Sequence, residues 1–145
     1  MVDKELLSRK ISRLRSYLEE LKSAEDIDWG KYQSDSRAKA FVERYLHLAI
    51  EEVMDIANHF VSFYKWREPI GYRDLFLILK EHGIISEKYL PTFQNMASFR
   101  NMLGHRYETI DDELVFGIFK ERLDDFELLI TVVVNWVESQ KGQTK

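Results

Sequence analysis

The stretch DSRAKAFVERYLHLAIEEVMDIANHFVSFY, residues 35–64, decides the fold that this sequence predicts. Apolar side chains recur along it at the three- and four-residue steps of an α-helix, and they cover more than one stripe of its surface. These apolar positions are Phe41, Tyr45, Leu48, Val53, Ile56, Ala57 and Phe60. A helix that is apolar on two sides is expected at the centre of a bundle, with neighbours on both flanks. A polar strip survives along it, formed by Arg44, Glu51, Asp55, Asn58 and Ser62.

The segment before this central helix predicts one helix and one loop. Residues 3–22 carry leucine and isoleucine at the same three- and four-residue spacing, which indicates an amphipathic helix. Residues 24–34 are expected to form a loop, because Asp28, Gly30 and Ser34 are residues that interrupt regular structure.

The segment after the central helix predicts a short helix and then a longer one. The short helix is expected over residues 72–82, and Gly83 suits the position that ends it. Pro91 lies in the early turns of the next helix, so this helix either starts late or is kinked. It is expected to reach about Leu103 and to stop at Gly104.

A last helix with an uninterrupted helical period completes the predicted fold. Thr109 or Asp111 is expected to cap it, and acidic residues follow in its first turn. Its apolar positions are Val115, Phe119, Leu123, Phe126, Ile130, Val133 and Val137. The expected fold class is therefore all-α, an up-and-down four-helix bundle with an additional short helix. It forms a single domain over residues 1–140, followed by a polar tail at residues 141–145.

Length and composition fit one ordinary globular domain. The chain has 145 residues, of which 45% are hydrophobic and 32% charged, and it has no cysteine, which excludes thiolate metal sites and a cysteine nucleophile. The sequence has no run of about eighteen apolar residues, and its opening MVDKELLSRK lacks a signal-peptide core, so we expect a cytoplasmic protein without a membrane segment. The net charge of −4 disfavours broad electrostatic binding to nucleic acid, so any RNA binding needs a local basic cleft.

The most informative motif is FRNMLGHRY at residues 99–107, at the end of the helix that follows Pro91. Arg100 and His105 are separated by four residues, Asn101 follows the arginine, and Tyr107 lies two residues after the histidine. The spacing alone is weakly specific, because an arginine and a histidine near a helix end can simply cap its carbonyl groups.

The surrounding sequence gives the motif a more specific meaning. The pattern R-N-x-L-x-H-x-Y resembles the R-x-x-x-x-H motif of HEPN domains, in the form found in the HepT-like family. The resemblance extends over nearly the whole chain. It includes residues 49–52, 55–59, 72–74, 83–85, 110–114 and 121–125.

This resemblance implies a function and a set of roles. HEPN domains are helical bundles, often homodimeric, and many are ribonucleases that use no metal or other cofactor. HepT-like members are usually paired with a minimal nucleotidyltransferase antitoxin. The implied catalytic residues here are Arg100 and His105, supported by Asn101, and the implied site of O-adenylylation by the partner is Tyr107. The alternative function is a non-catalytic partner that binds a nucleotide or substrate for a minimal nucleotidyltransferase.

The chemistry places a geometric demand on the motif. His105 suits acid–base work and Arg100 can bind phosphate with its guanidinium group. On one straight helix, side chains five residues apart point about 140° away from each other, so convergence within one chain requires a break, for which Gly104 is well placed. A symmetric dimer would supply two motifs to one cleft.

Two other groups of residues leave alternatives open. Glu51, Asp55 and His59, with His47 before them, step along one side of the central helix. They could bind a metal, form a polar seam, or help to position Arg100. Several aromatic residues could stack on RNA bases or fill the core instead. They are Trp29, Phe63, Tyr64, Trp66, Tyr72 and Trp136.

Overall fold

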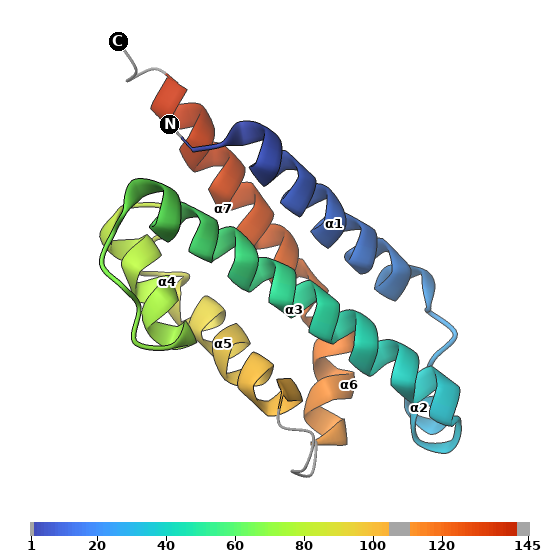
Figure 1. Ribbon diagram of the computed structural model, residues 1–145. Helices are drawn as coiled ribbons and strands as arrows, with labels where there is room; N and C mark the ends of the chain where they lie inside the picture. The colour runs from blue at the N-terminus through green and yellow to red at the C-terminus, as the bar shows by residue number, and fades with distance from the viewer. Residues whose placement is uncertain (1, 105–110, 142–145) are drawn as a thin grey trace.

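The computed structural model describes residues 2–104 and 111–141 of the chain, and these residues form seven helices and no strand (Figure 1). The helices are α1 (Lys4–Ser23), α2 (Trp29–Ser34), α3 (Ser36–Tyr64), α4 (Tyr72–Glu81), α5 (Leu90–Gly104), α6 (Asp112–Glu121) and α7 (Leu123–Lys141). The predicted all-α class is confirmed.

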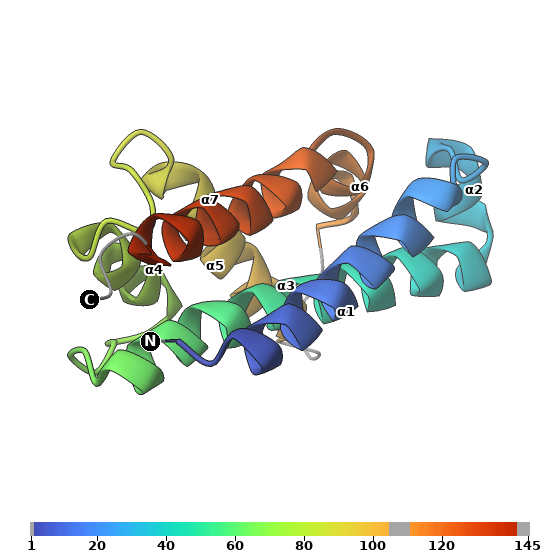
Figure 2. The same ribbon diagram turned by 90° about the horizontal axis from the view of Figure 1, so that it is seen from above.

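The long helix α3 is the centre of the bundle, as its two-sided apolar pattern predicted. It packs against each of the other six helices of the described chain. In Figures 1 and 2, α1 lies along one flank of α3, and α4 and α5 lie along the other. The chain runs in opposite directions in α1 and α3, and again in α5 and α7, so the up-and-down arrangement is confirmed.

The core forms where α3 meets its neighbours. The buried residues of α3 include Val42, Leu46, Ala49, Ile50, Val53, Ile56, Ala57 and Phe60. Phe41, Tyr45 and Leu48, which were expected to face inward, are only half-buried, because the fully buried stripe lies one residue further along the helix. Leucines and isoleucines of α1 meet this stripe as predicted.

Side-chain and glycine caps fix where the helices begin and end. Asp35 accepts hydrogen bonds from two backbone N–H groups at the start of α3, and Asp111 accepts one at the start of α6. Gly83 ends α4 with a φ of 82°, and the N–H of the next residue donates to the carbonyl of Leu79 at 2.9 Å. This is the left-handed helix end that the glycine predicted.

The predicted loop at residues 24–34 was wrong in part, because it contains α2. Asp28, taken as a breaker, accepts a hydrogen bond from the N–H of Lys31 at 2.8 Å and so starts this helix. Tyr32 is fully buried, and its ring packs against Trp29 and Phe116. Tertiary aromatic packing therefore stabilises a helix that is too short to form by itself.

The predicted last helix was also wrong in one respect, because it is two helices. The chain leaves helical geometry at Arg122, where φ is −120° and ψ is 10°, and α7 begins at the next residue. The break lets α6 pack against α3 while α7 packs against α1, α3 and α5. Among the described residues, no helix combines the length and the hydropathy that crossing a membrane requires.

Candidate functional site

Arg100 lies on the face of α5 that meets α3 and α4. Its Nε donates a hydrogen bond to Oε1 of Glu51 on α3 at 2.7 Å. The guanidinium carbon lies 4.6 Å from the ring centroid of Tyr72, the first residue of α4. The guanidinium is therefore restrained by a charge-assisted hydrogen bond and by an aromatic face, which three different helices bring together.

The surroundings of Arg100 remain open to solvent. The side chain of Arg100 is 26% exposed and that of Glu51 is 38% exposed. Nε2 of His47, one turn before Glu51 on α3, lies 3.4 Å from the same carboxylate oxygen. Asn101, the next residue of α5, is exposed. A charged ligand could thus reach the arginine without unfolding the bundle.

A network of hydrogen bonds holds α4 and the ring of Tyr72 in place. Arg73 donates to the carbonyl of Gln94 at 3.1 Å and to the hydroxyl of Ser98 at 2.8 Å, which joins α4 to α5. Arg67 binds Asp74 through both Nη atoms and lowers the pKa of that carboxyl to about 2. These hydrogen bonds hold α4, and with it Tyr72, without any contribution from Arg100.

The acidic and histidine strip of α3 divides between two environments. Glu51 contacts Arg100, whereas Asp55 is exposed. His59 lies near Lys10 and Asp3 at the start of α1, and its Nε2 is buried without a hydrogen-bond partner among the described residues. Burial, and secondarily the charge of Lys10, lowers the pKa of His59. The strip does not converge, and the described part of the chain holds no cluster of three such side chains suited to a metal.

The aromatic residues are engaged mainly in packing. Trp66 stacks on Tyr64 and on His82, with ring centroids 3.7 Å apart in the second pair. Trp136 packs edge-on against Phe60 and Tyr64. Tyr72 is the member of the predicted set that contacts the candidate site.

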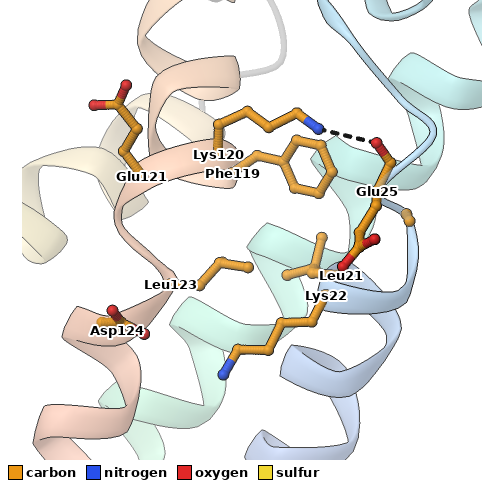
Figure 3. A pocket seen from close by; sticks show the side chains of 9 residues that line it. Leu21, Lys22, Glu25, Phe119, Lys120, Glu121, Leu123 and Asp124 are labelled. Atoms are coloured by element: carbon orange, nitrogen blue, oxygen red, sulfur yellow. Dashed lines mark hydrogen bonds between the residues drawn. The ribbon is translucent and has the colours of Figure 1, made fainter.

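The two larger of three hollows that the described residues form lie away from Arg100. One, of about 330 Å³, opens between the end of α1 and the junction of α6 and α7 (Figure 3). Its lysines are engaged, since Lys120 donates to the carbonyl of Glu25 and Lys22 pairs with Glu127. The other, of about 470 Å³, lies between α5 and the α6–α7 pair and is mainly apolar. Arg100, Glu51 and Tyr72 line neither of them.

The structure therefore addresses only part of the predicted site. Arg100 contacts Glu51 and Tyr72, and Asn101, the next residue of α5, is exposed. His105 and Tyr107 lie outside the described residues, as does the predicted left-handed break after α5, whose last described residue is Gly104. Glu51 and Tyr72 join Arg100 from 49 and 28 residues away in sequence, and the only signal for Glu51 was its place in the polar strip.

Comparison with solved structures defines the class of this bundle. The tri-AMPylated HEPN toxin of Shewanella oneidensis, solved in complex with an MNT antitoxin, superposes with a TM-score of 0.80 at 24% identity, covering 93% of this chain and 99% of that one. The cytosolic protein YutE of Bacillus subtilis superposes with a TM-score of 0.82 at 19% identity, covering 99% and 96%. The fold is that of HEPN proteins.

Sequence comparison then gives the family. The model described as "Ribonuclease HepT-like" matches residues 10–133, so the protein belongs to the ribonuclease HepT-like family. Similar proteins include the mRNA nuclease HepT of Shewanella oneidensis, 26% identical over 73% of this chain and 80% of that protein. The tRNA nuclease HepT of Aphanizomenon flos-aquae is 24% identical over 91% of this chain and 90% of that protein.

Proposed function

We propose that this protein is a metal-independent endoribonuclease toxin that cleaves cytoplasmic RNA and that a cognate minimal nucleotidyltransferase antitoxin neutralises. One observation carries the proposal. In a chain of the ribonuclease HepT-like family, the motif arginine Arg100 is held in a solvent-accessible position by Glu51 and Tyr72. A restrained, accessible guanidinium is what phosphate recognition requires.

The proposed reaction uses the substrate's own 2′-hydroxyl as the nucleophile. A general base removes its proton, the 2′-oxygen attacks the adjacent phosphorus, and a general acid protonates the departing 5′-oxygen. We assign the acid–base work to His105, whose side-chain type titrates near neutral pH. Arg100 stabilises the charge that develops on the phosphate, and Asn101 supports its orientation.

A homodimer would complete this site. One histidine supplies one acid–base group, whereas the reaction needs a base and an acid. Two motifs related by a twofold axis supply two histidines and two arginines to one cleft. They would also provide local positive charge on a chain whose net charge is −4.

The nucleotidyltransferase partner would act on Tyr107. A relative of this fold has been solved as a tri-AMPylated HEPN toxin with its MNT antitoxin, which supports adenylylation as the means of control. Adenylyl groups on Tyr107, which shares the motif with Arg100 and His105, would add bulk and negative charge, and both would exclude the phosphate of RNA.

The test is cleavage of single-stranded RNA by the purified protein in excess EDTA. We expect cleavage by the wild type, and a loss of at least about 100-fold in Arg100→Ala and in His105→Ala. Arg37→Ala is the matched control, because this exposed arginine lies about 21 Å along α3 from Glu51 and should leave the rate unchanged. Equal cleavage by all four proteins would indicate a contaminating nuclease and favour the non-catalytic binding partner.

A further inference from the structure

Glu51 is placed to control the direction in which Arg100 points. The two residues come from different helices, and the pair joins Nε of Arg100 to a single carboxylate oxygen at 2.7 Å. The Nε hydrogen bond and the Tyr72 ring act on different parts of the guanidinium. The hydrogen bond holds Nε, and the ring centroid lies 4.6 Å from the guanidinium carbon.

The Nε hydrogen bond occupies one part of a side chain that is 26% exposed. A guanidinium offers five N–H donors, and Glu51 takes the one on Nε. Within residues 2–104 and 111–141, neither Nη atom of Arg100 forms a hydrogen bond. The described residues therefore leave both Nη groups to bind two phosphate oxygens side by side, which is the strongest geometry that arginine offers to phosphate.

We propose that Glu51 is a positioning residue for the ribonuclease reaction. It holds Arg100 by Nε so that the Nη edge faces the scissile phosphate, and it takes no part in proton transfer itself. This inference rests on the proposed function, because it assigns Glu51 a role in the same site.

The main rival role for Glu51 is to neutralise Arg100. A carboxylate that only offsets the charge of the arginine would weaken phosphate binding, and its removal would speed cleavage or lower KM. A positioning carboxylate acts differently, because its removal frees a long side chain to sample other rotamers. The loss then falls on kcat, since a misplaced group fails in the transition state more than in the bound substrate.

Kinetics of three variants in EDTA test the inference. Glu51→Ala should lower kcat by about 10- to 100-fold. Its KM should stay within about threefold of the wild-type value. Glu51→Gln should recover to within about threefold of wild type, because its amide oxygen still accepts the Nε hydrogen bond. Glu19→Ala, which removes an exposed glutamate from α1 and changes the net charge equally, should match wild type.

An NMR measurement reports the same contact without relying on catalysis. The Nε–Hε signal of Arg100, assigned by its loss in Arg100→Lys, should be observable in wild type and should exchange faster with water in Glu51→Ala. Unchanged exchange in Glu51→Ala would overturn the inference, as would an unchanged or increased kcat. If wild type is active and Glu51→Ala matches it, the inference fails alone. If wild type does not cleave RNA, the proposed function fails and the positioning role fails with it.

Discussion

At the scale of the residue, Arg100 is held through Nε and through contact with one aromatic ring, whereas the described residues leave its Nη atoms without a hydrogen bond. Tyr72 on α4 and Glu51 on α3 each restrain the guanidinium that Arg100 carries on α5. Another ion pair between an arginine and a glutamate has a different arrangement. Arg13, for example, places its guanidinium on the buried carboxylate of Glu52, on the flank of α3 that faces α1. That pair joins two helices of the core, whereas Arg100 keeps an open edge.

His59 gives a prediction about pH and stability. Its folded-state pKa is lowered, chiefly by burial, so the unfolded chain binds a proton more readily than the folded chain does. The stability that depends on neutral His59 is complete above its unfolded pKa of about 6.5 and decreases as the pH falls through that value towards the lower folded pKa. Replacing His59 with Phe keeps an aromatic ring beside Phe60 and Phe63 and removes the titration.

Urea unfolding at about pH 7.5 and about pH 5.5 measures this contribution. The free energy of unfolding should fall further on acidification in wild type than in His59→Phe, while carboxylates elsewhere affect both proteins equally. An identical fall in the two proteins would show that His59 titrates in the folded chain as it does in the unfolded one.

At the scale of the element, two glycines predict opposite effects of the same substitution. Gly83 has a φ of 82° at the end of α4, where a Cβ is strained although nothing lies within 4 Å of it. Gly83→Ala should lower the free energy of unfolding by about 1–2 kcal/mol. Gly117 lies within α6, where an added Cβ also meets nothing within 4 Å. Gly117→Ala should raise the free energy by about 0.5–1 kcal/mol, because alanine favours a helix interior.

Chemical denaturation of the two variants beside wild type checks both signs. The comparison isolates backbone conformation, because both substitutions add one methyl group in open space. A loss of stability in Gly117→Ala, or none in Gly83→Ala, would contradict the helix boundaries described above.

The helices also show what local sequence can and cannot predict. The period of α3 predicted its central place, and Gly83 predicted the end of α4, because both features arise within a few turns of chain. The short helix α2 depends on contact between Tyr32 and Phe116. These residues lie far apart in sequence, so no local pattern predicted the helix. The break at Arg122 carries no glycine or proline, and the apolar period continues through it. Packing of α6 and α7 against different neighbours accompanies that break.

At the scale of the whole molecule, the bundle brings segments that are distant in sequence into contact around Arg100. The motif predicted Arg100 and its chemistry, but its contacts with Glu51 and Tyr72 are set by how α3 and α4 pack against α5. From the sequence, Glu51 belongs to a polar strip that could either bind a metal or help to position Arg100. In the structure, Glu51 contacts Arg100, whereas His59 lies near residues at the start of α1, so the two side chains do not share one site.

We propose that the chain cleaves RNA through the 2′-hydroxyl of the substrate, with Arg100 at the phosphate and without a metal. The most direct test is to compare one single-stranded RNA with the same sequence fully 2′-O-methylated, both in excess EDTA. We predict that wild type cuts the unmodified RNA and leaves 2′,3′-cyclic phosphate ends, that the methylated RNA stays intact, and that Arg100→Ala cuts neither. Cleavage of the methylated RNA, or cleavage that EDTA abolishes, would contradict it.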